Sequence, residues 1–196
     1  MAACNSFPLC APVGLLLLLL GLFSSHPPEV QARPTDFWCN RQERKRMEQR
    51  TFEDLKKDMA DCVGSDVLSS TVQLPSVRLH VAEWENKTLQ QKHAEVLGAL
   101  QVFQAWMATN QTTLQCQSSL LKKLQRQITN HLLIVNQIPK QIDAVVPSEN
   151  TIQESTSQTR LKKVLDQYEK LIKVKLERLA KDLEGIICKV LPSATT

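Results

Sequence analysis

The chain has 196 residues, of which 42% are hydrophobic and 5% aromatic, and it carries a formal net charge of +4 at pH 7. This length suits one folded domain with processed ends. The positive charge suits an acidic partner surface, but it is too small and too dispersed to indicate a nucleic-acid-binding protein.

The first 32 residues contain no Lys or Arg and hold the apolar run Val13–Phe23. That run is too short to cross a bilayer, and it has the length of a signal-peptide core. The tripeptide "VQA" (30–32) places short apolar residues where a signal peptidase recognises them, so we expect cleavage after Ala32, with a site near Ser25 as the alternative. No later run approaches ~20 apolar residues. The sequence therefore predicts a secreted, extracellular product of residues 33–196 without membrane insertion.

Removal of the signal peptide leaves four of the six cysteines, namely Cys39, Cys62, Cys116 and Cys188. An even number in an oxidising compartment predicts two disulfides, with three possible connectivities. No pair of cysteines has zinc-finger spacing, and the remaining histidines are isolated in the sequence. We therefore expect neither a metal site nor a cofactor.

A first helix is predicted from about Cys39 to Val63, because apolar residues recur there at near-helical spacing. The stretch Gly64-Ser65-Asp66 ends it. We expect its buried stripe to consist of Met47, Phe52, Leu55, Met59 and Cys62.

Three more helices follow, over about Ala82 to Thr109, Leu114 to Gln137 and Gln158 to Val190. No alternating strand pattern of comparable length appears, so the predicted fold class is all-α. The fourth helix has the clearest pattern, with apolar residues spaced by threes and fours: Leu161, Leu165, Tyr168, Ile172, Leu176, Leu179, Leu183, Ile186 and Val190.

The connections between these helices are long, short and long. A short connection makes neighbouring helices antiparallel, whereas a long one allows the chain to return along the bundle so that the next helix runs parallel. About 18 extended residues reach ~60 Å, and a helix of about 25 residues is only ~37 Å long. The predicted architecture is an up-up-down-down, long-chain four-helix bundle with two long crossover connections.

This topology selects among the disulfide connectivities. Cys39 and Cys188 fall at one end of the predicted bundle, and Cys62 and Cys116 fall at the other. Joining Cys39 to Cys62 would span ~35 Å of one helix, against the ~6 Å between Cα atoms that a disulfide tolerates. Only the pairs Cys39–Cys188 and Cys62–Cys116 remain.

Two acceptor sequons for N-glycosylation are present, at Asn86 and Asn110. Asn110 lies at the predicted turn between the second and third helices, and we expect it to be modified. Asn86 follows Glu83 by three residues, so the two side chains share one side of a helix if the second helix has already begun there.

Two further stretches, "LPSVRLHVAEW" (74–84) and "LIKVKLERL" (171–179), accompany the four cysteines. Together these features resemble the erythropoietin/thrombopoietin family of helical cytokines, over the whole of the expected mature bundle. The cysteines are closer to the thrombopoietin branch of that family. Erythropoietins tend to place a second cysteine just after the one that ends the first helix, whereas here the expected partner is Cys116.

The resemblance implies a secreted haematopoietic cytokine that binds a class I cytokine receptor, with no cofactor and no enzymatic activity. It also implies that one monomer joins two receptor chains through two different faces and so triggers kinase signalling. The first face combines the first helix, the long link that follows it and the fourth helix; the second combines the first and third helices. For the thrombopoietin branch, the implied role is megakaryocyte and platelet production.

Matching residue by residue, Pro75, Glu83 and Lys175 fall on family positions of the first, high-affinity receptor face. Counting back from the last cysteine selects Lys175, whereas matching the "KV" pair selects Lys173. Arg46 falls on a basic family position that we assign to the second, weaker face.

Some positions depart from the thrombopoietin pattern or have a simpler interpretation. Asn40, Gln42 and Arg178 differ from the residues of the thrombopoietin pattern, so we assign them no receptor contact. Pro75 alternatively stiffens an extended link, and Glu83 is alternatively an acid favoured near a helix N-terminus. Lys175 alternatively belongs to a solvated helix face, and in either interpretation we expect it to be exposed. Trp84 is expected to be a packing residue.

Other functions remain as alternatives. The chain lacks the G-x-S-x-G, H-E-x-x-H and Gly-rich phosphate-loop motifs, and it leaves no cysteine free as a nucleophile, which disfavours an enzyme. The open alternatives are an erythropoietin-like or other helical cytokine and, more distantly, a secreted small-molecule carrier with a cavity inside the bundle.

Overall fold

The computed structural model describes residues 34–62, 66–109, 115–138 and 155–190. The chain divides into two compact units, Met1–Ala32 and Arg33–Thr196, and all described residues belong to the second. The predicted cleavage site and the sequon at Asn110 lie outside the described residues.

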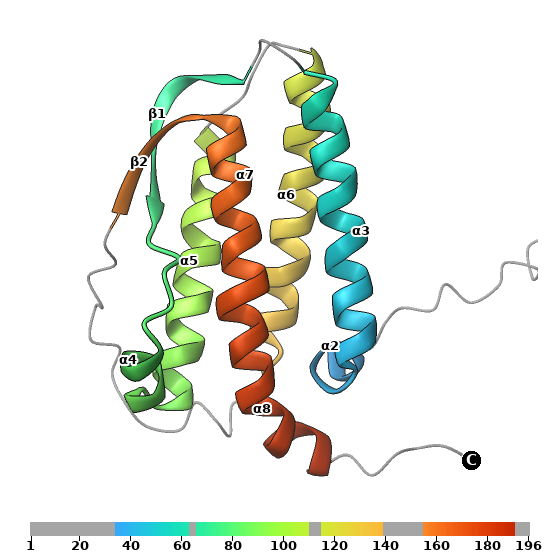
Figure 1. Cartoon of the computed structure of the whole chain (residues 1–196), viewed down its shortest axis with the longest axis vertical. Helices are drawn as coiled ribbons and strands as arrows, with labels where there is room; N and C mark the ends of the chain where they lie inside the picture. The colour runs from blue at the N-terminus through green and yellow to red at the C-terminus, as the bar shows by residue number, and fades with distance from the viewer. Residues whose placement is uncertain (1–33, 63–65, 110–114, 139–154, 191–196) are drawn as a thin grey trace, which may run out of the picture. The chain divides into compact units, whose positions relative to one another are not determined.

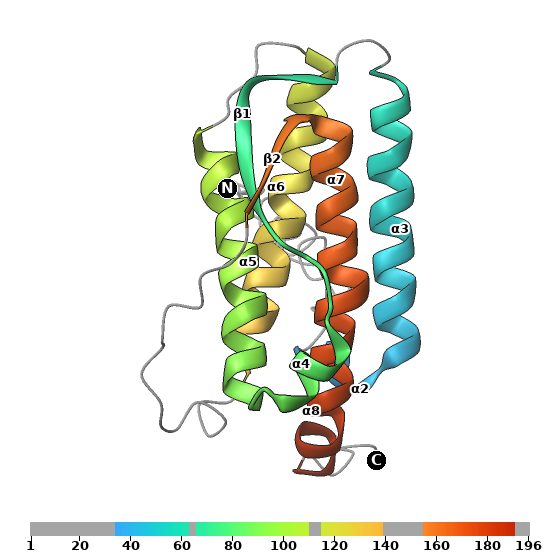
Figure 2. The ribbon, with the colours of Figure 1, turned by 60° about the vertical axis from the view of Figure 1, so that its left-hand side comes forward.

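The second unit is a bundle of four long helices (Figure 1). Helix α2 (Pro34–Cys39) leads into α3 (Arg41–Ala60), and α4 (Val81–Asn86) precedes α5 (Leu89–Thr109) and α6 (Gln115–Asn136). The last helix has three consecutive parts, which we call helix D: α7 (Leu161–Lys170), the π-helical turn η1 (Leu171–Leu176) and α8 (Glu177–Val190). Figures 1 and 2 show α3 and α5 running in one direction and α6 and helix D in the other, which confirms the up-up-down-down topology.

Caps change the bounds of two predicted helices. The first begins at Arg41, because Asn40 caps it with a side-chain oxygen that accepts a hydrogen bond from the Glu43 amide at 3.1 Å. The short helix α2 that precedes it was not predicted. The second divides at Lys87 and Thr88. There the Gln91 amide donates to the Thr88 hydroxyl at 3.2 Å, while the Thr88 amide donates to the Gln91 side chain at 2.9 Å. This reciprocal pair is a capping box, so α5 starts afresh after the short helix α4.

A two-stranded antiparallel ribbon joins the two long connections, which the sequence pattern did not predict. Strand β1 (Val67–Pro75) pairs with β2 (Ser155–Arg160), with Pro75 opposite Ser155 and an irregular register between Val67 and Val72. The predicted start of the last helix at Gln158 is wrong, because residues 158–160 belong to β2. The ribbon lies over α5 and α7 (Figures 1 and 2).

The apolar stripes form the core largely as expected. Most of the expected stripe residues of helix D are buried, and so is the apolar stripe of α6, which consists of Leu120, Leu121, Leu124, Ile128, Leu132 and Val135. Two expectations are wrong: Met47 is 42% exposed and Ile186 is 43% exposed. Arg44 and Glu48 occupy the buried side of α3 instead, and Ile187 replaces Ile186 in helix D.

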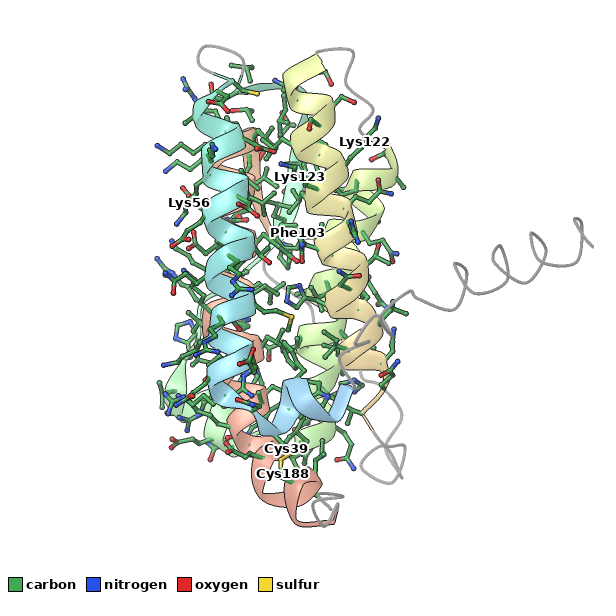
Figure 3. All side chains as sticks on the ribbon, turned by 90° about the vertical axis from the view of Figure 1, so that its right-hand side faces the viewer. Cys39, Lys56, Phe103, Lys122, Lys123 and Cys188 are labelled. Atoms are coloured by element: carbon green, nitrogen blue, oxygen red, sulfur yellow. A yellow bond between two sulfur atoms is a disulfide. The ribbon has the colours of Figure 1, made fainter. Side chains whose placement is uncertain are left out.

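Cys39 and Cys188 form a disulfide with a Cα–Cα distance of 5.6 Å, which ties α2 to the end of helix D (Figure 3). This confirms the first predicted pair. Cys62 is also disulfide-bonded, but the side chain of Cys116 lies outside the described residues, so its pairing with Cys62 stays a prediction. Within the described ranges, no helix combines the length and apolarity needed to span a bilayer.

Candidate functional site

The segment between β1 and α5, residues 76–88, runs along helix D and contains the short helix α4 (Figure 2). We call this segment the link. It includes most of the distinctive "LPSVRLHVAEW" stretch, so its anchoring decides how Glu83 and Trp84 are presented.

One anchor of the link is Trp84, which is 2% exposed. Its indole Nε1 donates to Asp182 Oδ2 of α8 at 2.9 Å, and Lys92 Nζ of α5 donates to the same oxygen at 2.9 Å. The Lys92 ammonium also lies 5.7 Å from the centre of the indole ring, within cation–π range. Trp84 is therefore a packing residue, as expected, and it binds α4 to both α5 and helix D.

A second anchor is a chain of alternating charges that begins in the core. Lys175 Nζ donates to the Ser76 carbonyl at 2.9 Å and pairs with Glu95 Oε1 at 2.5 Å. The other carboxylate oxygen of Glu95 pairs with Lys87 at 2.8 Å, and Lys87 in turn pairs with Glu83 at 2.5 Å. Side-chain exposure rises along the series from 5% at Lys175 to 61% at Glu83. The chain thus connects the buried side of helix D to the surface of α4.

These ion pairs set the protonation of the carboxylates. Burial alone would raise the pKa of Glu95, yet the hydrogen bonds from Lys175 and Lys87 hold that pKa below its ordinary value. The hydrogen bond from Lys87 likewise lowers the pKa of Glu83. Both acids therefore stay ionised at neutral pH, and Glu83 presents a negative charge to solvent.

The three residues assigned to the first face differ in their exposure to solvent. Glu83 is exposed, whereas Pro75 is buried at the end of β1. The expectation that Lys175 is exposed is wrong, because its residue is only 4% exposed. The alternative match, Lys173, lies two residues away on the outer side of helix D, with 45% of its side chain exposed.

Asn86 is exposed and ends α4, in the same short helix as Glu83. Residues three apart lie on one side of a helix. A glycan on Asn86 would therefore crowd Glu83.

Arg46 points to solvent from α3, with 65% of its side chain exposed, and it pairs with Glu43 one turn away at 2.9 Å. Its neighbour Arg44 is entirely buried, and sequence reasoning missed it. The guanidinium of Arg44 pairs with Glu177 of helix D at 2.7 Å and donates to the backbone carbonyls of Phe37 and Trp38. Arg44 thus holds α2, α3 and helix D together beneath the surface.

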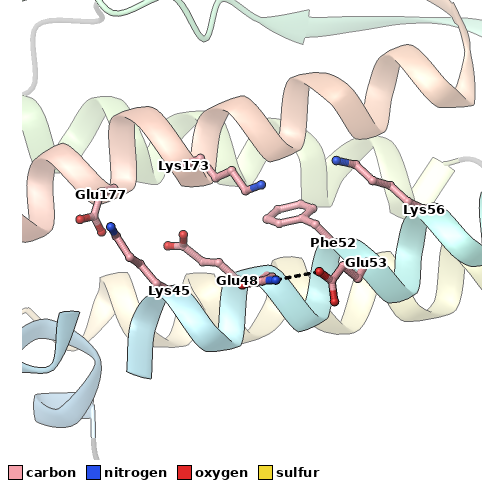
Figure 4. A pocket seen from close by; sticks show the side chains of 8 residues that line it. Lys45, Glu48, Phe52, Glu53, Lys56, Lys173 and Glu177 are labelled. Carbon is pink, nitrogen blue, oxygen red and sulfur yellow. Dashed lines mark hydrogen bonds between the residues drawn. The ribbon is translucent and has the colours of Figure 1, made fainter. Parts of the chain in front are cut away.

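A groove of about 550 Å³ separates α3 from helix D (Figure 4). Phe52 lies in it, and the ammonium of Lys173 stands 5.4 Å from the centre of the Phe52 ring. Burial, reinforced by the negative charge of Glu177, raises the pKa of Glu48 to about 7. The lining residues are Lys45, Glu48, Gln49, Phe52, Glu53, Lys56, Lys173 and Glu177.

A second groove, of about 490 Å³, lies on the other side of helix D, along the link. It is lined by Ser76, Val77, Arg78, Leu79, Thr156, Gln167, Lys170 and Val174. The exposed side of helix D, with Lys170, Lys173 and Val174, is therefore flanked by α3 and by the link. The three elements form one surface, which we call the α3–D–link face.

The α3–D–link face carries both basic and acidic side chains, a composition that fits the recognition of another protein. Within the described part of the chain, no cluster of three or more His, Cys, Asp or Glu side chains is placed to hold a metal ion.

Residues 47–189, from α3 to the end of helix D, match the family model described as erythropoietin/thrombopoietin. A search of curated proteins returned no match.

Proposed function

The chain belongs to the erythropoietin/thrombopoietin family, and from that premise we propose that it is a secreted haematopoietic cytokine that dimerises a class I cytokine receptor. Members of this family are helical cytokines that bind receptors of this class. The proposed product acts by bringing two receptor chains together, so that their associated kinases signal.

The observation that carries the proposal is the α3–D–link face. Val174, 39% exposed, lies among the charged side chains of helix D, and Val81 of α4 is 54% exposed. Protein interfaces commonly combine apolar with polar contacts. The basic residues Lys170 and Lys173 suit an acidic receptor surface, and complementary charge would speed the encounter of the two proteins.

We assign the first receptor contact to this face, with Glu83 and Lys173 as contact residues. Lys173 is preferred to Lys175 because only Lys173 is accessible. Pro75 is assigned a supporting role, since it is buried where β1 ends and the link begins.

The second receptor contact is assigned to α3 and α6, which lie side by side in Figure 3. Lys123 of α6 pairs with Asp58 of α3 at 2.6 Å and joins the two helices at the surface. Arg46 belongs to this face in the proposal. Two distinct faces on one monomer support a complex of one ligand with two receptor chains.

Within the family, we propose the thrombopoietin branch, and hence a role in megakaryocyte and platelet production. The cysteine arrangement supports this choice, because Cys62 is not followed closely by another cysteine as in erythropoietins. An erythropoietin-like cytokine is the second candidate.

The test is to apply the purified protein to cells that carry the thrombopoietin receptor, the erythropoietin receptor or neither, and to measure kinase phosphorylation. We expect signalling only in the first cells. A response only through the erythropoietin receptor would move the protein to the other branch. No response in any of them, with a small molecule bound in native mass spectrometry, would favour the carrier.

A further inference from the structure

We propose that Lys175 is a positioning residue: it does not touch the receptor, but holds the link so that α4 presents Glu83 to it. This inference rests on the proposed receptor-binding function. It assigns a different role from the direct contact that the family resemblance implied for this position.

The burial of Lys175 argues against a direct contact. Its side chain is 5% exposed, and its ammonium is already engaged by the Ser76 carbonyl and by Glu95. A receptor would have to break these bonds to reach it. The outer side of helix D is instead formed by Lys173 and Val174, which are 45% (side chain) and 39% exposed.

The bonds of Lys175 fix the link at its start and near its end. The hydrogen bond to Ser76 holds the first residue of the link against helix D. Glu95 transmits the second bond, because its carboxylate also binds Lys87, the residue that follows α4. Lys87 then pairs with Glu83. One buried ammonium therefore constrains both sides of α4.

Removing that ammonium has a definite consequence. Glu95 would lose the ion pair with Lys175, and the Ser76 carbonyl would lose the hydrogen bond that Lys175 donates. Buried polar groups left without partners are costly, so the link would shift toward arrangements in which water reaches them. The Trp84–Asp182 hydrogen bond is independent of Lys175 and would keep α4 attached to helix D. The expected result is a loosened link on an intact bundle.

A loosened link makes the Glu83 contact for only part of the time. While the link is displaced, the receptor still binds the rest of the face but without Glu83, so the apparent Kd rises toward that of Glu83→Ala, by about tenfold for one charged contact. Glu83 would then contribute less to binding, since its carboxylate is no longer held toward the receptor.

The test compares three single variants of the full mature protein: Lys175→Met, Glu95→Gln and the exposed control Lys173→Met. Hydrogen exchange of residues 76–88 measures how firmly the link is held. The Kd for the extracellular domain of the responding receptor is measured well below the melting temperature of each variant, so that all are folded. We expect Lys175→Met and Glu95→Gln to accelerate exchange and raise Kd about tenfold. Lys173→Met should leave exchange unchanged.

A double-mutant cycle separates positioning from a purely structural role. Glu83→Ala should raise Kd in the unmodified protein and have little further effect in the Lys175→Met background. If Lys175→Met raises Kd without changing exchange in the link, Lys175 is a contact and the inference is wrong. If exchange accelerates but Kd does not change, or if the effects of Glu83→Ala and Lys175→Met simply multiply, the inference is also wrong. If the proposed function itself is wrong, the result differs, because the unmodified protein would then bind no class I receptor.

Discussion

Arg44 and Glu177 form an ion pair in which Nε lies 2.7 Å from Oε2, across 133 residues of sequence. The guanidinium side chain is fully buried, and 11% of the carboxylate side chain is exposed. The pair joins α3 to helix D beneath the groove of the proposed receptor face. It therefore sets the spacing of two of the three elements that form that face.

The first prediction concerns this pair. Arg44→Met should lower the free energy of unfolding by about 3–5 kcal/mol, because it leaves a buried carboxylate without its closest cation. The exposed control Arg46→Met should change it by less than ~0.5 kcal/mol. Denaturant unfolding with the disulfides intact measures both. Equal effects of the two substitutions would contradict a special role for Arg44.

A second prediction concerns Glu48, whose pKa is raised from 4.5 to about 7 by burial and by the nearby charge of Glu177. The folded state binds this proton more tightly than the unfolded state does. The contribution of Glu48 to stability is therefore greatest below pH 4.5 and declines as pH rises to about 7, by an amount on the order of 3 kcal/mol. Glu48→Gln should remove this dependence and stabilise the protein most at pH 8.

The measurement is the difference between the stability curves of the unmodified protein and Glu48→Gln from pH 4.5 to 8. The difference is needed because His131 acts in the opposite direction. Burial lowers the pKa of His131 to about 4 from 6.5, so its contribution to stability is lost as pH falls through that range. Parallel curves for the two proteins would show that Glu48 does not titrate in this window.

A third prediction distinguishes the two proposed receptor faces. Lys173→Glu should abolish binding to a single receptor chain, because it reverses a charge in the first face. Arg46→Glu should retain that binding but reduce signalling, since the second receptor chain is no longer captured. Surface binding assays and kinase phosphorylation measure the two steps separately. Loss of all binding in Arg46→Glu would place Arg46 in the first face.

A fourth prediction concerns the remaining disulfide. Peptide mapping without reduction should recover Cys62 joined to Cys116, together with Cys39 joined to Cys188. A disulfide between Cys62 and any other cysteine would require a different arrangement where α3 ends and α6 begins.

The fifth prediction concerns glycosylation. We expect a glycan at Asn110 and low or tolerated occupancy at Asn86, because Asn86 and Glu83 share one side of α4. Glycopeptide mass spectrometry measures the occupancy, and Asn86→Gln tests its effect on receptor binding. Full occupancy at Asn86, with binding unchanged after its removal, would show that Glu83 lies off the receptor surface.

The sequence by itself determined the helical bundle and its topology. Apolar residues such as Leu124 and Tyr168 recur at the helical period, and a helix with such a stripe must bury it. The lengths of the connections then selected the up-up-down-down order. That order placed Cys39 beside Cys188. The start of α5 was also present in the sequence, as the Thr88–Gln91 capping box, although the periodicity alone ran through it.

Only the tertiary structure decided which polar residues are buried and where the link lies. Arg44, Glu48 and Lys175 carry no periodic signal, because a charged side chain is buried only when a distant partner compensates its charge. Those partners, Glu177 for Arg44 and Glu95 for Lys175, come from other helices.

The β1–β2 ribbon likewise depends on segments that are distant in the sequence. Strand β1 buries Val72 and Leu74, whereas β2 is polar and mostly exposed. The two strands pair because the crossover connections meet over α5 and α7, and the sequence of neither strand specifies that meeting.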